Sequence, residues 1–159
     1  MTTDTFVVCS ALLVSLISLT VAFLTYYQDH RRRKKQSTIE YYSNMANELY
    51  PLDERTNTLL GGVVPTPEKL STDKELLALA TKLLSSYERL SVGVNAGIFD
   101  FDIIDRMAGS HLIALYARFE PYINSIRNEG NQKYFYVEFE KLAMRIRSNR
   151  SAYKNKGRM

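Results

Sequence analysis

The sequence is poor in the residues and motifs on which most catalytic sites depend. Its single cysteine, Cys9, cannot form an internal disulfide, and one thiol alone builds neither a metal site nor a thiol-nucleophile arrangement. The only two histidines, His30 and His111, are too far apart in sequence to form a metal-binding pair on one helix. Gly61-Gly62 is not followed by Lys-Ser or Lys-Thr, so it is not a phosphate-binding loop. We therefore expect a protein that is not an enzyme and that uses no metal or other cofactor.

Charge is absent from residues 5–27, which read TFVVCSALLVSLISLTVAFLTYY. As a helix this segment spans roughly 35 Å, at about 1.5 Å per residue, which is enough to cross the apolar core of a bilayer. Tyr26 and Tyr27 end the segment at the level expected for an interfacial aromatic belt. We predict a single transmembrane helix, with the lipid bilayer as the first partner of the chain.

The charges on either side of this segment predict its orientation. Only Asp4 precedes it, whereas a basic flank follows, made of Arg31, Arg32, Arg33, Lys34 and Lys35. The positive-inside rule then places the N-terminus outside and the C-terminus in the cytoplasm, as a single-pass protein of the inner (cytoplasmic) membrane. A cleaved signal peptide would need basic residues before a shorter apolar run, and neither is present. The flank itself is interpreted as a stop-transfer signal that attracts anionic headgroups, or as a contact for a ligand or nucleic acid.

The remaining residues predict a helical cytoplasmic part. We expect residues 1–35 to be anchor and flank, 36–70 to be a linker helix and loop, and 71–159 to be a helical domain with a basic tail. The linker helix should run over residues 37–50 and end at Pro51, followed by a loop over residues 51–70.

Apolar periodicity predicts the helices of the domain. The clearest begins at a capping box over residues 72–75, ends near residues 93–97, and has an apolar face with spacings of three and four residues. A further helix should begin at Asp100 or Asp102 and break or kink at Pro121, and a last one should begin near Gln132. No segment alternates like a strand. The predicted class is all-α, one transmembrane helix followed by a bundle of three to five helices. The inward faces are expected to be Leu76, Ala80, Leu83, Tyr87, Leu90 and Val94, then Ile104, Ala108, Leu112, Leu115 and Phe119, then Phe135, Phe139, Leu142 and Ile146.

Several short stretches of this domain carry a family resemblance. They are Leu83-Leu84-Ser85-Ser86-Tyr87-Glu88-Arg89-Leu90-Ser91-Val92-Gly93-Val94, then Gly97-Ile98-Phe99-Asp100, Pro121-Tyr122-Ile123 and Glu140-Lys141-Leu142-Ala143. Over about residues 76–147 the chain resembles the bacterial family catalogued as domain of unknown function 4760. The resemblance implies one N-terminal membrane helix followed by a cytoplasmic helical module, and it implies no activity. In architecture alone, the chain is also similar to membrane effectors of prokaryotic antiviral defence, including those of type III CRISPR systems that sense cyclic oligoadenylate.

The end of the chain is strongly basic. Residues 36–140 carry fifteen acids and nine bases, whereas residues 141–159 carry seven bases and no acid. Arginine forks beside an aromatic ring suit phosphate and base recognition. The candidate ligand-binding residues are Arg145, Arg147, Arg150, Tyr153 and Lys154. The alternative is a solvated tail that touches the anionic membrane.

Other polar residues also have a functional and a structural interpretation. His111 lies at the margin of an apolar face, which favours a partly buried packing histidine. Asp100, Asp102 and Asp105 could bind a metal or act as acids, but caps and first-turn charges explain them without a function, and this interpretation is favoured. Glu88 could act in catalysis, or could simply pair with Arg89 or Lys82 on a solvated face.

These observations leave two main hypotheses. In the first, the cytoplasmic domain forms a homo-oligomer, binds a cyclic nucleotide or another anionic ligand, and signals to the membrane segment. In the second, the protein is an adaptor that recruits a cytoplasmic protein partner through the acidic middle of the chain or through residues 51–70.

Overall fold

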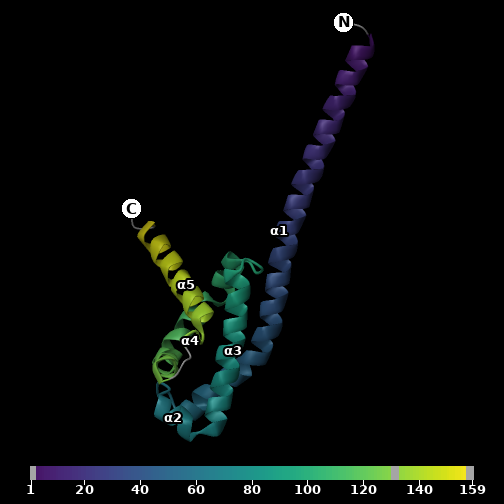
Figure 1. Ribbon diagram of the computed structural model, residues 1–159. Helices are drawn as coiled ribbons and strands as arrows, with labels where there is room; N and C mark the ends of the chain where they lie inside the picture. The colour runs from purple at the N-terminus through teal and green to yellow at the C-terminus, as the bar shows by residue number, and fades with distance from the viewer. Residues whose placement is uncertain (1–2, 130–132, 157–159) are drawn as a thin grey trace. The chain divides into compact units, whose positions relative to one another are not determined.

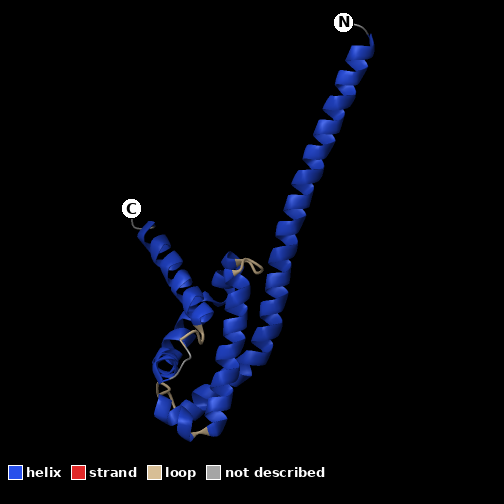
Figure 2. Cartoon of the chain, in the orientation of Figure 1, coloured by secondary structure: helices blue, strands red, loops and turns tan. Residues whose placement is uncertain are grey.

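The structure is a computed structural model that describes residues 3–129 and 133–156, with side chains for residues 12–128 and 133–152. The described residues form five helices and no strand, which confirms the all-α class (Figure 2). The chain divides into two compact units, Met1–Gln36 and Ser37–Met159. The boundary falls inside the first helix, α1 (Thr3–Leu60), which is labelled in Figure 1.

The first unit contributes only the leading part of α1. Its described apolar side chains are exposed, including Leu12 at 66 % and Phe23 at 66 %. The hydroxyls of Ser18, Thr20 and Thr25 each donate to the carbonyl four residues earlier at 2.8 Å, so they are satisfied within the helix. Among the described residues, α1 is the one helix that is long and apolar enough to cross a membrane.

Within the second unit, α1 continues through Pro51 to Leu60, so the prediction of a loop over residues 51–70 is wrong. Proline removes an amide donor and often ends a helix, but packing on either side can hold the helix together. The buried positions recur every three or four residues without interruption, namely Tyr42, Ala46, Leu49, Asp53, Thr56 and Leu60. Because Asp53 and Thr56 are polar, the apolar periodicity that predicts a helix stops at Leu49 in the sequence.

Two residues fix the end of α1. Gly61, with φ at +60°, donates its amide to the carbonyls of Asn57 and Thr58 at 3.1 Å, a backbone conformation that favours glycine. The ammonium of Lys69 donates to the Leu60 carbonyl at 2.8 Å, where a cation also complements the helix dipole. Lys69 belongs to the short helix α2 (Pro67–Thr72), so only residues 61–66 remain as a connection.

Helix α3 (Lys74–Asn95) is the centre of the core. Asp73 caps it by accepting hydrogen bonds from the amides of Glu75 and Leu76 at 3.0 Å, one residue later than the capping box predicts. The six residues predicted to face inward along this helix are all at most 2 % exposed. The helix ends at Asn95, and Gly97 follows with φ at +75°, which confirms the predicted end.

Helix α4 (Phe101–Glu129) begins after Asp100, whose Oδ1 accepts the amide of Ile103 at 3.1 Å, as predicted for a cap. The helix runs through Pro121 without a break, because Phe119 and Ile123 on either side are fully buried and continue its inner face.

Helix α5 (Val137–Lys156) begins five residues later than predicted. Tyr136 precedes it with φ at +57° and is only 9 % exposed, whereas Phe135, predicted to face the core, is 45 % exposed. The turn before α5 therefore buries Tyr136 in place of the predicted Phe135. The buried face of α5 itself begins at Phe139.

Candidate functional site

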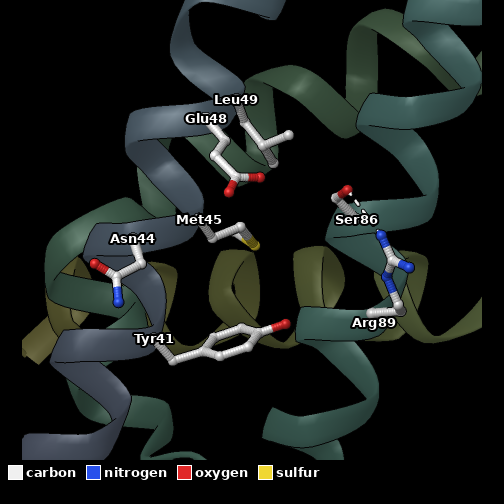
Figure 3. Close-up of a pocket in the computed structure, with 7 residues that line it drawn as sticks. All are labelled: Tyr41, Asn44, Met45, Glu48, Leu49, Ser86 and Arg89. Atoms are coloured by element: carbon white, nitrogen blue, oxygen red, sulfur yellow. Dashed lines mark hydrogen bonds between the residues drawn. The ribbon is translucent and has the colours of Figure 1, made fainter.

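A cavity of about 260 Å³ lies between α1 and α3, within the Ser37–Met159 unit (Figure 3). It is partly open to solvent, and both of its walls are helices, so its shape rests on the packed core. The lining residues are Tyr41, Asn44, Met45, Glu48, Leu49, Ser86 and Arg89.

The α1 wall is one face of that helix. Tyr41, Met45 and Glu48 are spaced by four and three residues, which brings them to the same side. Leu49, 1 % exposed, ties this wall to the core, and Met45 lies in the middle of the cavity in Figure 3. The Tyr41 ring stacks on Phe99 with centroids 4.5 Å apart, so its position is also set by packing. The floor of the cavity is therefore apolar and held in place.

The α3 wall supplies the hydrogen-bonding groups. Ser86 and Arg89 are three residues apart, and the Nη2 of Arg89 donates to the Ser86 hydroxyl at 3.2 Å, drawn as the dashed line in Figure 3. The described contacts give the guanidinium this one hydrogen bond, although the group carries five N–H donors. Arg89 thus lines the cavity with unused donors, and it also lines a second hollow of about 480 Å³ that includes Glu88 and Tyr136.

Opposite charges stand on the two walls. Glu48 belongs to α1 and Arg89 to α3, and no ion pair between described residues includes either of them. An anion and a cation that line one cavity without pairing leave both charges available to a ligand.

The three residues Tyr87, Glu88 and Arg89 point in three directions, since successive side chains on a helix are about 100° apart. Tyr87 is fully buried and meets His111. The Glu88 carboxylate accepts the backbone amides of Glu138 at 3.1 Å and of Phe139 at 2.7 Å, so it caps α5. The interpretation of Glu88 as part of a solvated face is wrong, because its partners are these amides. Of the three, only Arg89 lines the cavity between α1 and α3.

A second polar cluster lies inside the bundle, where α1, α3 and α4 meet. His111 Nε2 lies 3.0 Å from the Tyr87 hydroxyl and 4.0 Å from Asp53 Oδ2. Arg118 donates to Asp53 Oδ1 at 2.8 Å and also contacts Asn57. The His111 side chain is 28 % exposed, which confirms the interpretation of a partly buried packing histidine.

Burial controls the protonation of this cluster. It lowers the pKa of His111, and Arg118 lowers it further, while the Asp53 carboxylate opposes both. Burial, followed by the negative charge of Asp53, raises the pKa of Tyr87. Neutral imidazole and neutral phenol are therefore the stable forms near pH 7, and they share a hydrogen bond. Each group already has a partner inside the protein.

The basic residues of α5 are only partly available. The Arg145 guanidinium lies over the Phe101 ring at 3.9 Å from its centroid. Arg150 donates from Nε to Asp105 Oδ1 at 2.6 Å and from Nη1 to the Ser110 hydroxyl at 2.5 Å, joining α5 to α4. Arg147 is exposed, and its one described contact is a weak one with the sulfur of Met144 at 3.9 Å. Tyr153 and Lys154 belong to α5, but their side chains lie outside the described residues.

The acidic candidates are accounted for by local contacts. Asp100 caps α4, and Asp105, with its side chain 10 % exposed, holds Arg150 and accepts Asn149 Nδ2 at 2.9 Å. Asp102 is exposed and lines a hollow of about 420 Å³ in which Asp105 and Arg150 are already paired. Among the described residues no group of three or more His, Cys, Asp or Glu could hold a metal ion.

The basic flank lies on α1 in the first unit. Arg33 pairs with Asp29 at 2.8 Å, and the Arg31 guanidinium lies over the Tyr27 ring at 5.0 Å. Arg32 and Lys35 are exposed, and Lys34 is half-buried. These are contacts within one helix, as expected for a flank that faces water or headgroups.

The cavity was not predicted from the sequence. Its α3 residues lie inside the stretch that carries the family resemblance, but a Ser86–Arg89 pair at helical spacing is common on solvated faces. The one sequence pattern that could have indicated the site is on α1. There the polar residues Tyr41, Asn44 and Glu48 recur at spacings of three and four, next to the buried residues of the helix. That signal identifies a polar face, and only the packing of α1 against α3 makes it one wall of a cavity.

Comparison with protein families gives one match. The model of the family described as "Domain of unknown function (DUF4760)" matches residues 12–146, which include most of the apolar segment of α1, the cavity and the first half of α5. Neither a curated protein nor a solved structure matches the chain.

Proposed function

The chain belongs to this family of domains of unknown function, and we propose that it is a membrane-anchored, non-catalytic sensor that binds an anionic ligand between α1 and α3. The observation that carries the proposal is the Arg89 guanidinium, which lines a preformed cavity with most of its donors unused. Guanidinium forks bind carboxylates and phosphates in two-point contacts, so an anionic group is the natural partner.

The position of the cavity suggests how binding would reach the membrane. The α1 wall of the cavity belongs to the helix that also contains the apolar segment. A ligand that bridges α1 and α3 favours the arrangement of these helices to which it binds most tightly, and it shifts their equilibrium by that difference in affinity. Because α1 is the one helix among the described residues that could cross a membrane, we propose that the signal involves a homo-oligomer of several chains.

Charge supports the proposed placement in the membrane. The basic flank over residues 31–35 favours a C-terminal domain in the cytoplasm, at the inner membrane. The exposed Arg147 and the bases that follow it add a second surface for phosphate groups, of a nucleotide or of a lipid. A cyclic nucleotide second messenger of antiviral defence is one candidate ligand, bound through its phosphates at Arg89 or at this basic surface.

The experiment is calorimetric titration of the full chain in detergent micelles with linear and cyclic nucleotides, at low and physiological salt. Specific binding should persist at the higher salt, because hydrogen bonds and packing in the cavity add to the charge attraction that salt screens. Arg89→Gln should abolish binding, whereas Lys82→Gln, which removes an exposed cation of the same helix outside the cavity, should not change it. Arg147→Gln tests the basic surface: if this variant alone loses binding, the ligand site is α5 and the cavity is not used.

One observation favours an adaptor as the second candidate. The connection over residues 61–66 exposes Val63 at 56 % and Val64 at 50 %, although both are apolar. Exposed apolar residues on a short connection suit a contact with a cytoplasmic protein partner. A stoichiometric partner that copurifies with the native chain and is lost with Val63→Ser/Val64→Ser, in the absence of any bound anion, would favour the adaptor.

A further inference from the structure

The two charged walls of the α1–α3 cavity restrict its ligand more closely than Arg89 alone. Glu48 on α1 carries a negative charge, is exposed, and has no ion-pair partner among the described residues. A ligand that is purely anionic would be attracted by Arg89 and repelled by Glu48. A ligand that is purely cationic would meet the opposite pair of forces. Each wall therefore selects against one class of singly charged ligand.

The floor of the cavity adds an apolar requirement. Met45 and Leu49 lie between the two charges, with the Tyr41 ring beside them (Figure 3). A methionine side chain adapts its shape to an apolar group, and a buried leucine gives a fixed surface. A fully polar ligand would leave the half-buried Met45 and the exposed Tyr41 ring against water and gain nothing from them.

The volume of the cavity gives the size of the group that can be enclosed in it. At about 30 Å³ per water molecule, 260 Å³ holds the equivalent of about nine waters. Free amino acids such as leucine and phenylalanine are of this size, and a cyclic oligonucleotide is far larger.

We propose that the cavity binds a small zwitterion with an apolar side group, of the class of an apolar α-amino acid. The carboxylate lies against the Arg89 guanidinium, the ammonium against the Glu48 carboxylate, and the apolar group on Met45 and Leu49. This inference rests on the proposed sensor function, since it assigns the anionic group of the ligand to Arg89 and adds the ammonium and the apolar part.

The proposal is tested by calorimetric titration of the full chain in detergent micelles with three probes that share the branched apolar group of leucine and differ in their charged groups. L-leucine has both charges, 4-methylpentanoate lacks the ammonium, and 3-methylbutylamine lacks the carboxylate. L-leucine, or L-phenylalanine in its place, should bind, and both singly charged analogues should bind about tenfold more weakly or worse, since each lost charged hydrogen bond weakens binding by at least that factor.

Substitutions measure the contributions of Glu48 and Arg89 to binding one at a time. Glu48→Gln should remove the advantage of L-leucine over 4-methylpentanoate, and Arg89→Gln should remove its advantage over the amine. Glu54→Gln, an exposed glutamate on the same helix outside the cavity, should leave all three affinities unchanged. Thermal unfolding followed by circular dichroism shows whether each variant retains the wild-type fold.

The outcomes distinguish this inference from the proposed function. If nucleotides or inorganic phosphate bind in an Arg89-dependent way and no amino acid does, the zwitterion proposal is overturned while the anion sensor stands. If no probe binds to the folded chain, both are overturned. Binding of L-leucine that Glu48→Gln leaves unchanged, with no preference over 4-methylpentanoate, also overturns the zwitterion.

Discussion

The Glu88 carboxylate on α3 accepts the backbone amide of Phe139 on α5 at 2.7 Å, and its second oxygen accepts the amide of Glu138 at 3.1 Å. Helix α5 is thus capped by a residue fifty positions earlier in the chain. The first amides of a helix have no partner within it, and a carboxylate there also complements the helix dipole. The contact joins the start of α5 to the central helix.

Glu88→Ala should therefore destabilise the protein by about 1–2 kcal/mol, the usual cost of losing a helix cap. Urea unfolding of the full chain, followed by circular dichroism, measures the change. Glu54→Ala is the matched control, because Glu54 is exposed and its described hydrogen bond involves only its carbonyl. Equal stability of the two variants would show that the Glu88 contact contributes nothing.

Gly93 makes room for Phe99. A Cβ added at position 93 would lie 2.5 Å from two ring atoms of Phe99, which is closer than two non-bonded carbon atoms approach in proteins. We expect Gly93→Ala to cost about 1–3 kcal/mol through overpacking, although alanine is the better helix former. With Phe99→Ala in the background, the same change should instead be neutral or stabilising. A double-mutant cycle by urea unfolding measures this reversal, and additive effects would contradict it.

The sequence predicts correctly those parts of the fold in which the buried side chains are apolar. All six residues predicted for the inner face of α3 are buried, because each is apolar or Tyr87, whereas the buried Ser86, Ser91 and Gly93 of that helix were not predicted. Helix α1 was predicted to end at Pro51, because its stripe continues through Asp53 and Thr56, which a hydrophobic pattern does not register. Asp53 is buried because Arg118 of α4 neutralises it, and that pairing is not visible before the fold is known.

The same limit applies to the candidate site. Arg150 was predicted as a ligand contact from its spacing on a basic helix, yet its acidic partner, Asp105, lies 45 residues earlier and contacts it at 2.6 Å. Arg89 was interpreted as part of a solvated face, yet packing against α1 places it on a cavity. Residue types and spacing predict which side of a helix is polar, and only the neighbouring helix decides whether that side is free, paired or part of a site.

The lowered pKa of His111 predicts a dependence of stability on pH. The folded protein holds the imidazole neutral beside Tyr87, whereas the unfolded chain protonates it near the ordinary value of about 6.5. The unfolded state therefore binds more protons as the pH falls through that value toward the lower folded pKa, so stability decreases over this interval. Urea unfolding between pH 5 and pH 8 should show this decrease, and His111→Gln should reduce it.

The titration of His111 can be observed directly. In a His30→Asn background, His111 is the one histidine left in the chain. Its ring signals, followed by nuclear magnetic resonance in detergent, should titrate below the ordinary pKa. A midpoint at or above about 6.5 would mean that Asp53 outweighs burial at this site.

The proposed orientation in the membrane predicts the behaviour of reporter fusions. A fluorescent protein fused after Met159 should fluoresce, and alkaline phosphatase fused at the same place should be inactive, because the proposed orientation puts the domain in the cytoplasm. The basic flank is the physical cause of this orientation. Replacement of all five residues of the flank, 31–35, by glutamine should therefore give a mixed or reversed orientation. The opposite reporter pattern in the native chain would reject the proposed placement.

Arg150 illustrates why a loss of binding needs a matched measurement of stability. Its guanidinium holds Asp105, whose side chain is 10 % exposed, so Arg150→Ala leaves a buried carboxylate without its cation. The cost should be about 1–3 kcal/mol, the usual penalty for an unpaired buried polar group. Arg147→Ala should change stability by less than about 0.5 kcal/mol, because Arg147 is exposed. If both variants lose an anionic ligand equally, the basic face of α5 binds it directly. If only Arg150→Ala does, and its stability falls as expected, the loss follows from displacement of α5 from α4.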